Sequence, residues 1–166
     1  MRVEQTPAGL VVEVGSQAET ARLGRAIAAA VGPGTVIGLV GTLGAGKTAL
    51  ARSIAGGLGV DPEAVLSPTF VLIHEYEGEL PVYHFDAYRL GGPEPFEAIG
   101  AAEYWDAGGV CLVEWSDLVA ETLPPGAWRV SIEPTGPESR RFTVSAPEPV
   151  TSRLAAALGG PGATGV

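Results

Sequence analysis

The sequence predicts an α/β fold with a mostly parallel central sheet, antiparallel strands beside it, and helices on its flanks. Two apolar runs of strand length, Thr35–Val40 and Val110–Val113, are typical of buried parallel strands. A glycine-rich turn follows the first run and leads into an amphipathic helix, as expected where strands and helices alternate. A hairpin pattern in the middle of the chain and two strand patterns near its end predict the antiparallel part.

The first third of the chain predicts two strands and two helices. Leu10–Val14 is a short strand pattern. Ser16–Glu19 has the capping-box pattern and predicts the start of a helix over Gln17–Val31, which a Gly-Pro-Gly segment ends. Thr35–Val40 is the first buried strand, and Thr48–Leu58 has its apolar residues on one helical face.

The rest of the chain predicts a hairpin, two helices and three strands. Phe70–Tyr76 and Val82–Phe85 form the hairpin, and Glu94–Trp105 is a helix entered through Gly-Gly-Pro. The remaining elements are the apolar run Val110–Val113, the strands Trp128–Ile132 and Arg141–Ser145, and the helix Val150–Leu158. Three ring side chains are interpreted as packing residues: His74, Trp115 and Trp128.

Length and composition indicate one domain. The chain has 166 residues, of which 46% are hydrophobic and 17% charged. We expect the domain to span 1–146, followed by an Ala-, Gly- and Pro-rich tail, 147–166, that is partly helical or frayed. No apolar run approaches the roughly 18 residues of a membrane span, and no secretory signal begins the sequence. The single cysteine, Cys111, excludes an intramolecular disulfide framework, so we expect a cytoplasmic protein.

The charge balance argues against direct binding of nucleic acid. The chain carries 10 Lys and Arg residues against 19 Asp and Glu, a net charge of −9. Its only adjacent cations are Arg140 and Arg141. A protein that binds nucleic acid with its own surface usually presents a basic face. Any contact with nucleic acid is therefore expected to need a partner.

The segment Gly41–Thr48 fits the spacing G-x-x-x-x-G-K-[ST] of a phosphate-binding loop, or P-loop. Glycines let backbone N–H groups turn toward anionic oxygens, and the next helix directs its dipole to the same point. Lys47 is expected to reach the β- and γ-phosphates, and the Thr48 hydroxyl to bind Mg²⁺. The expected phosphate-binding residues are Gly41, Thr42, Leu43, Gly44, Ala45, Gly46, Lys47 and Thr48. The predicted fold is therefore P-loop NTPase-like, and a glycine-rich turn that binds nothing is the alternative.

The sequence favours ATP over GTP. Guanine-selective P-loop proteins typically carry an Asn-Lys-x-Asp element. This chain has no Asn, and its one lysine, Lys47, already belongs to the loop.

Three further residues are candidates for chemistry beside the loop. Glu114 directly follows Val110–Val113 and is expected to hold Mg²⁺ or its water, or to orient the attacking water. Asp86 ends the second hairpin strand and is a candidate for acting on water or Mg²⁺, with a structural ion pair to Arg89 as the alternative. Thr69 lies where switch-like loops occur in P-loop NTPases, with a proline turn entering a strand as the alternative.

Four motifs, in this order and spacing, resemble the TsaE (YjeE) family. They are Gly-x-Leu-Gly-Ala-Gly-Lys-Thr, Ser-Pro-Thr-Phe, His-Phe-Asp-x-Tyr-Arg and Leu-Val-Glu-Trp. The resemblance runs from about Thr20 to Arg141, and Thr42 stands where the family commonly has Asp. Family members are small bacterial ATPases needed for threonylcarbamoyladenosine formation in tRNA.

The resemblance implies a role for each matched position. Gly41–Thr48 would hold the ATP phosphates, and Thr48 with Glu114 would bind Mg²⁺. Asp86 would be needed for hydrolysis, and Thr69 would belong to a nucleotide-responsive loop.

Placement of the adenine is a further implication of the resemblance. Gln17 to Thr20, at the start of the first helix, would lie near the base. Arg140 or Arg141 from the last strands would also be close to it.

The resemblance also implies partners. Family proteins act with a heterodimer of the threonylcarbamoyl-transferase subunit and its inactive paralogue. That pair modifies the adenosine beside the anticodon of tRNAs that read codons beginning with A. This chain would hydrolyse ATP to reset the complex between turnovers and would reach tRNA only through it. No membrane or DNA partner is expected.

The leading hypothesis is a Mg-dependent ATPase that supports this modification. Water would attack the γ-phosphate in line, with Asp86 or Glu114 positioning it. A P-loop small-molecule kinase is one alternative, but the scattered Arg52, Arg89 and Arg129 form no Arg-rich lid segment. A nucleotide-gated binding module with negligible hydrolysis is the other alternative.

Overall fold

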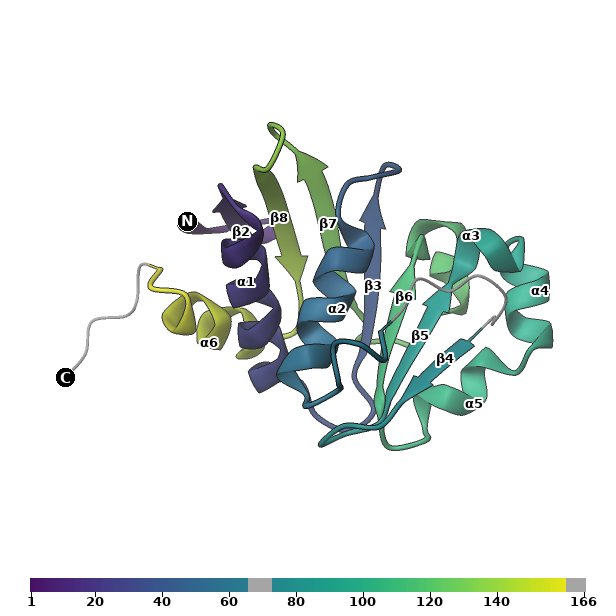
Figure 1. Ribbon diagram of the computed structural model, residues 1–166. Helices are drawn as coiled ribbons and strands as arrows, with labels where there is room; N and C mark the ends of the chain where they lie inside the picture. The colour runs from purple at the N-terminus through teal and green to yellow at the C-terminus, as the bar shows by residue number, and fades with distance from the viewer. Residues whose placement is uncertain (66–72, 161–166) are drawn as a thin grey trace.

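The computed structural model describes residues 1–65 and 73–160, which contain one eight-stranded sheet (Figure 1). Its strands are β1 (Arg2–Thr6), β2 (Gly9–Val14), β3 (Val36–Gly41), β4 (Ile73–Tyr76), β5 (Val82–Asp86), β6 (Val110–Glu114), β7 (Trp128–Pro134) and β8 (Arg140–Ser145). The spatial order is β1-β2-β8-β7-β3-β6-β5-β4. The central strands β7, β3, β6 and β5 run parallel, whereas the outer pairings are antiparallel. The predicted α/β class with a parallel centre is confirmed.

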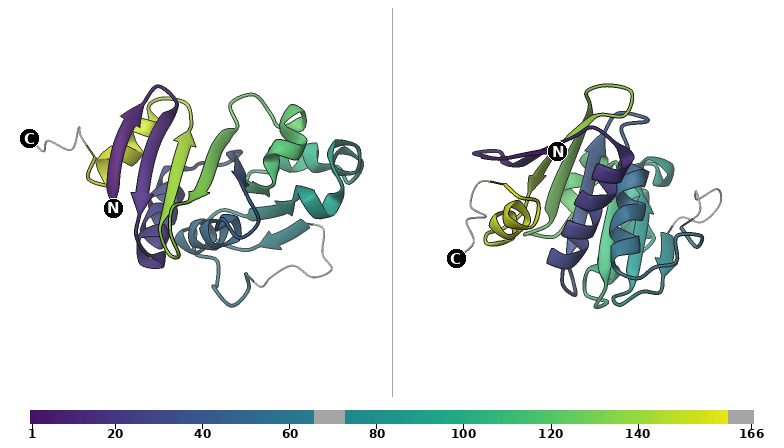
Figure 2. Two further views of the ribbon diagram at one scale, coloured as in Figure 1. Left: turned by 90° about the horizontal axis from the view of Figure 1, so that it is seen from above. Right: turned by 60° about the vertical axis from the view of Figure 1, so that its left-hand side comes forward.

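Helices cover both faces of the sheet (Figures 1 and 2). On one face, α1 (Gln17–Ala30) and α2 (Lys47–Gly57) lie side by side, and α6 (Val150–Ala157) packs next to α1. The opposite face carries α3 (Ala87–Leu90), α4 (Pro93–Ala98), α5 (Ala101–Trp105) and the 3₁₀ helix η1 (Ser116–Thr122). No helix among the described residues is both long enough and apolar enough to cross a membrane.

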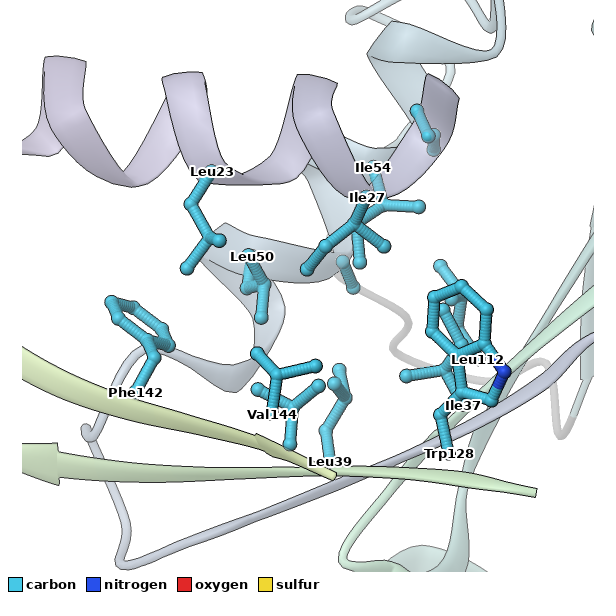
Figure 3. Close-up of a cluster of buried hydrophobic side chains, with 14 of the residues drawn as sticks. Leu23, Ile27, Ile37, Leu39, Leu50, Ile54, Leu112, Trp128, Phe142 and Val144 are labelled. Atoms are coloured by element: carbon cyan, nitrogen blue, oxygen red, sulfur yellow. The ribbon is translucent and has the colours of Figure 1, made fainter. Parts of the chain in front are cut away.

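One hydrophobic core lies between α1, α2 and the sheet (Figure 3). Leu23 and Ile27 of α1, and Leu50 and Ile54 of α2, are fully buried there. They face Ile37, Leu39, Leu112, Phe142 and Val144 from the strands. Burying one such aliphatic side chain contributes about 1.5–3 kcal/mol. This core fixes α2 on the sheet, and with it the residues that begin the helix.

A second, aromatic core lies under α3, α4 and α5. The Phe85 ring is 5.6 Å from the Phe96 ring, 5.5 Å from Tyr104 and 5.6 Å from Trp105. Cys111 is fully buried in the same cluster, and this burial raises the pKa of its thiol to about 12. Cys111 is therefore a small buried hydrophobe and not a reactive thiol.

The structure corrects the prediction of a single helix over Glu94–Trp105. Two short helices, α4 and α5, occupy this segment. Gly100 separates them with a φ of 78°, in the left-handed region that glycine adopts without strain.

The sequence pattern also missed β1, α3 and η1. The first of these is a polar edge strand, and α3 is only four residues long.

The predicted hairpin and last helix are present. β4 pairs antiparallel with β5, with His74 opposite His84. The part of the predicted strand before Ile73 lies outside the described residues. Within α6, Leu154 is buried, and Leu158 directly after the helix is buried as well; both join the core that contains α1.

Helix α1 begins as the capping pattern predicts, with one difference. The Ser16 hydroxyl accepts a hydrogen bond from the Glu19 N–H at 3.3 Å. The Glu19 carboxylate does not return a bond to Ser16, as a capping box would. It accepts instead from the Gly15 N–H and from the Met1 ammonium, both at 2.7 Å.

Ser16→Ala is expected to lower the free energy of unfolding by about 1 kcal/mol, because the first turn of α1 loses its side-chain cap. Urea unfolding measures this change. Ser16→Asn keeps a capping acceptor and should remain within a few tenths of a kcal/mol of the wild type. Equal losses in both variants would show that the hydroxyl cap contributes nothing specific.

Candidate nucleotide-binding site

The glycine-rich loop joins the end of β3 to the start of α2. Gly44 and Gly46 have φ values of 75° and 113°, so the loop uses the left-handed freedom of glycine at both positions. Lys47 begins α2, and its side chain turns back to donate to the Gly41 and Thr42 carbonyls, both at 2.8 Å. The loop therefore closes around the amine of Lys47.

Lys47 is 5% exposed, and its amine lies 3.8 Å from the centroid of the Trp115 ring. Burial lowers the pKa of Lys47, and the nearby charges of Glu114, Asp117 and Asp86 offset part of this effect. Trp115 has a φ of 58°, an uncommon and strained conformation for a non-glycine residue. The sequence prediction of a packing role missed this contact, because nothing in the sequence places the ring over the amine.

Glu114 links the loop to the neighbouring strand. The Thr48 hydroxyl donates to its Oε1 at 2.8 Å, and His84 Nε2 lies 2.6 Å from its Oε2. Burial raises the pKa of Glu114, but the hydrogen bonds from His84 and Thr48 and the charges of His84 and Lys47 outweigh it, so the net shift is downward. Glu114 is therefore a buried, ionised carboxylate aimed at the hydroxyl of Thr48.

Asp86 stands opposite Glu114 in the β5–β6 register. Its Oδ1 accepts from the Tyr88 and Arg89 N–H groups at 3.1 and 3.3 Å, so Asp86 caps α3. Its Oδ2 lies 3.6 Å from Arg89 Nε. The ion pair to Arg89 that the sequence left open is thus present, and the same carboxylate also lines the cavity beside the loop.

Two cavities meet at the start of α2. The first has a volume of about 260 Å³ and lies beside the loop. It is lined by Leu43, Gly44, Gly46, Lys47, Thr48, Ala49, Asp86, Glu114 and Trp115. The second, of about 470 Å³, shares Gly46 and Ala49 with the first. The fold thereby brings the loop, Asp86 and Glu114 together around one space.

The second cavity contains the residues expected near the adenine. Gln17 and Thr20 line it from the start of α1, and Arg140 lines it from β8. The Arg140 Nε also donates to the Ala45 carbonyl at 2.7 Å, which ties the β7–β8 hairpin to the loop. Arg141 does not line this cavity. Its guanidinium pairs with the Glu13 carboxylate at 2.9 Å. Thr69 lies outside the described residues.

Thr48 and Glu114 suit a metal ion that arrives with a nucleotide. The described residues hold no group of three or more His, Cys, Asp or Glu side chains that would bind a metal alone. Mg²⁺ is commonly held by one or two protein oxygens together with substrate phosphates and water. A hydroxyl bonded to a buried carboxylate at the end of a parallel strand fits that requirement.

Comparisons with known proteins agree on one family. The family model for threonylcarbamoyl adenosine biosynthesis protein TsaE matches residues 14–142. The Bacillus subtilis tRNA threonylcarbamoyladenosine biosynthesis protein TsaE is 43% identical over 129 residues, covering 77% of this chain and 80% of that protein. The Treponema pallidum protein of the same name is 40% identical over 130 residues, covering 78% of this chain and 96% of its own.

A solved structure extends the similarity to the fold. The crystal structure of Bacillus subtilis YdiB superposes with a TM-score of 0.71 at 33% sequence identity. The match covers 96% of this chain and 97% of that one. The chain therefore belongs to the TsaE family, and its function lies in tRNA threonylcarbamoyladenosine biosynthesis.

Proposed function

We propose that this protein is a Mg-dependent ATPase that supports the tRNA modification by binding the threonylcarbamoyl-transferase complex and resetting it. The observation that carries the proposal is the arrangement of Lys47, Thr48 and Glu114 around the cavity at the glycine-rich loop. A lysine, a hydroxyl and a buried carboxylate at this point are the parts that P-loop ATPases use to bind phosphate and Mg²⁺.

The phosphates of ATP would occupy the cavity of about 260 Å³. Lys47 would exchange its bonds to the Gly41 and Thr42 carbonyls for bonds to phosphate oxygens. Hydrogen bonds to a charged acceptor are stronger than those to a neutral carbonyl. Thr48 and Glu114 would hold Mg²⁺, which supplies charge neutralisation at the β- and γ-phosphates when bound. The adjoining cavity of about 470 Å³ would take the nucleoside, with Gln17 and Thr20 beside the adenine.

Hydrolysis would need a positioned water at the γ-phosphate. We assign that role to Asp86, because it lines the phosphate cavity and Glu114 is already assigned, with Thr48, to the metal ion. The backbone bonds that cap α3 hold Asp86 in a fixed orientation. Removing such a positioned group typically costs about 10²–10⁴-fold in rate.

The proposed partners are the threonylcarbamoyl-transferase subunit and its inactive paralogue. The net charge of −9 supports contact with tRNA through that heterodimer and not through this chain alone. ATP hydrolysis would return the complex to its starting state between turnovers, so this protein would not transfer the threonylcarbamoyl group itself.

Thr48→Ala tests the metal side of this proposal. In the wild type, Mg²⁺ is expected to strengthen ATP binding, and excess EDTA to remove that gain and to stop hydrolysis. In Thr48→Ala we expect about tenfold or more of the Mg-dependent gain to be lost, because the protein's hydroxyl ligand is gone. Calorimetric titration with ATP, once in Mg²⁺ and once in EDTA, measures the Mg-dependent gain in ATP affinity for the wild type and for Thr48→Ala.

Thr143→Ala is the matched control, because this β8 residue lines neither cavity. It should bind ATP as the wild type does, with the same response to Mg²⁺. ATP binding by the wild type that ignores Mg²⁺ would contradict the proposed metal site. Transfer of phosphate to a small-molecule acceptor would favour the kinase alternative.

A further inference from the structure

Glu114 is held at both carboxylate oxygens by side chains from two other elements. Thr48 of α2 donates to Oε1 at 2.8 Å, and His84 of β5 lies 2.6 Å from Oε2. Glu114 is 5% exposed and His84 3% exposed, so the contact between them is largely shielded from solvent. Among the described residues, no other side chain bonds to this carboxylate. Two opposite contacts therefore fix both the position and the plane of the carboxylate.

We infer that His84 is a positioning residue of the magnesium site. By holding Oε2, it keeps Oε1 of Glu114 directed at the Thr48 hydroxyl, and so sets how tightly the nucleotide site takes up Mg²⁺. The inference rests on the proposed function, since it concerns the metal of the same site.

His84 has no direct route to the nucleotide. It does not line the cavity around the loop, whereas Thr48, Asp86 and Glu114 all do. The β5–β6 register places His84 opposite Leu112 and Asp86 opposite Glu114, so His84 reaches Glu114 diagonally across the parallel pair. Any effect of His84 on the metal must therefore pass through the carboxylate of Glu114.

The surroundings of His84 keep it in place. It lies on a central strand and not in a loop, and the His74 ring on β4 packs against it with centroids 6.4 Å apart. Without the imidazole, Oε2 would be buried with no donor, which is unfavourable in a low-dielectric interior. The carboxylate would then turn toward other groups and leave the geometry that suits Mg²⁺.

Two substitutions of His84 separate a positioning role from a packing role. His84→Leu keeps most of the volume and removes the donor, whereas His84→Gln keeps an N–H donor that extends toward Glu114. We expect His84→Leu to need about tenfold more Mg²⁺ for half-saturation of the ATP complex, as is typical when the group behind a metal ligand is lost. The Mg²⁺ concentration for half-saturation in His84→Gln should stay within about threefold of the wild-type value. Titrating Mg²⁺ at fixed ATP and following ATP binding gives these values.

ATP affinity in excess EDTA is the internal control, and it should be the same in all three proteins. Should His84→Leu fail to fold, His84→Asn replaces it in the comparison, because its shorter amide does not reach Glu114. Thermal unfolding without ligand verifies that each variant is folded. Binding, and not turnover, is the readout throughout.

A double-mutant cycle tests whether His84 acts through Glu114. In a Glu114→Ala background, adding His84→Leu should leave the Mg²⁺ requirement unchanged. An equal Mg²⁺ requirement in His84→Leu and wild type, or a further loss in the Glu114→Ala background, would overturn the inference. Wild-type protein that binds ATP without any response to Mg²⁺ would overturn the proposed function itself, so the two failures are distinguishable.

Discussion

Lys47→Ala is expected to lower kcat/KM for ATP hydrolysis by about 10²–10³-fold. Lys47 is the only lysine of the chain, and the fold buries its amine at the glycine-rich loop against the Gly41 and Thr42 carbonyls. No other cation lines the cavity at the loop, so nothing among the described residues replaces its charge on the phosphates. Steady-state hydrolysis with Mg²⁺ measures the loss.

Two further variants accompany this measurement. Lys47→Arg keeps the charge but introduces a planar fork that the closed loop does not accommodate, so we expect a similar loss. Arg153→Ala removes an exposed cation on α6 and should leave hydrolysis unchanged. If Lys47→Ala hydrolysed ATP like the wild type, the glycine-rich loop would not be the site of the reaction.

Gly24→Ala is expected to lower the free energy of unfolding by about 1–3 kcal/mol. Gly24 lies where α1 meets α2, and a Cβ atom there would come 2.8 Å from the Ser53 carbonyl carbon and 3.1 Å from the Ile54 nitrogen. Because these are backbone atoms, the two helices would have to move apart. This cost exceeds the gain of up to about 1 kcal/mol that alanine brings to a helix.

Gly56→Ala is the matched control on the partner helix. A Cβ atom at Gly56 meets nothing within 4 Å, so only the helix preference of alanine remains. We expect this variant to be more stable than the wild type by up to about 1 kcal/mol. Urea unfolding measures the stability of both variants. An unchanged m-value shows that a shifted midpoint reflects stability alone. Equal shifts of the same sign would contradict close packing of α1 on α2 at Gly24.

The sequence was sufficient for the elements that carry strong local patterns. The apolar runs that became β3 and β6 are buried on both faces, so their composition predicts them without knowledge of their neighbours. The glycine-rich loop is equally local, because its spacing alone fixes where Lys47 and Thr48 begin α2. The broken helix at Gly100 was missed because an isolated glycine is tolerated in a helical pattern.

Contacts that depend on strand order could not be predicted. His84 meets Glu114 only because β5 lies beside β6, and no pattern in the chain specifies that pairing. Trp115 reaches Lys47 through a left-handed backbone conformation, which the sequence gives no reason to expect of a tryptophan. The cavity that Gln17 and Arg140 share joins residues from opposite ends of the chain, so the family resemblance indicated it in advance and no local pattern did.

The decisive measurement is steady-state ATP hydrolysis with Mg²⁺, made on this protein alone and after adding the threonylcarbamoyl-transferase heterodimer from the same organism. We expect slow turnover alone, a clear rise with the heterodimer, and loss of both in Lys47→Ala. Turnover that the heterodimer does not change would contradict a partner-regulated ATPase and favour an independent ATPase or a kinase.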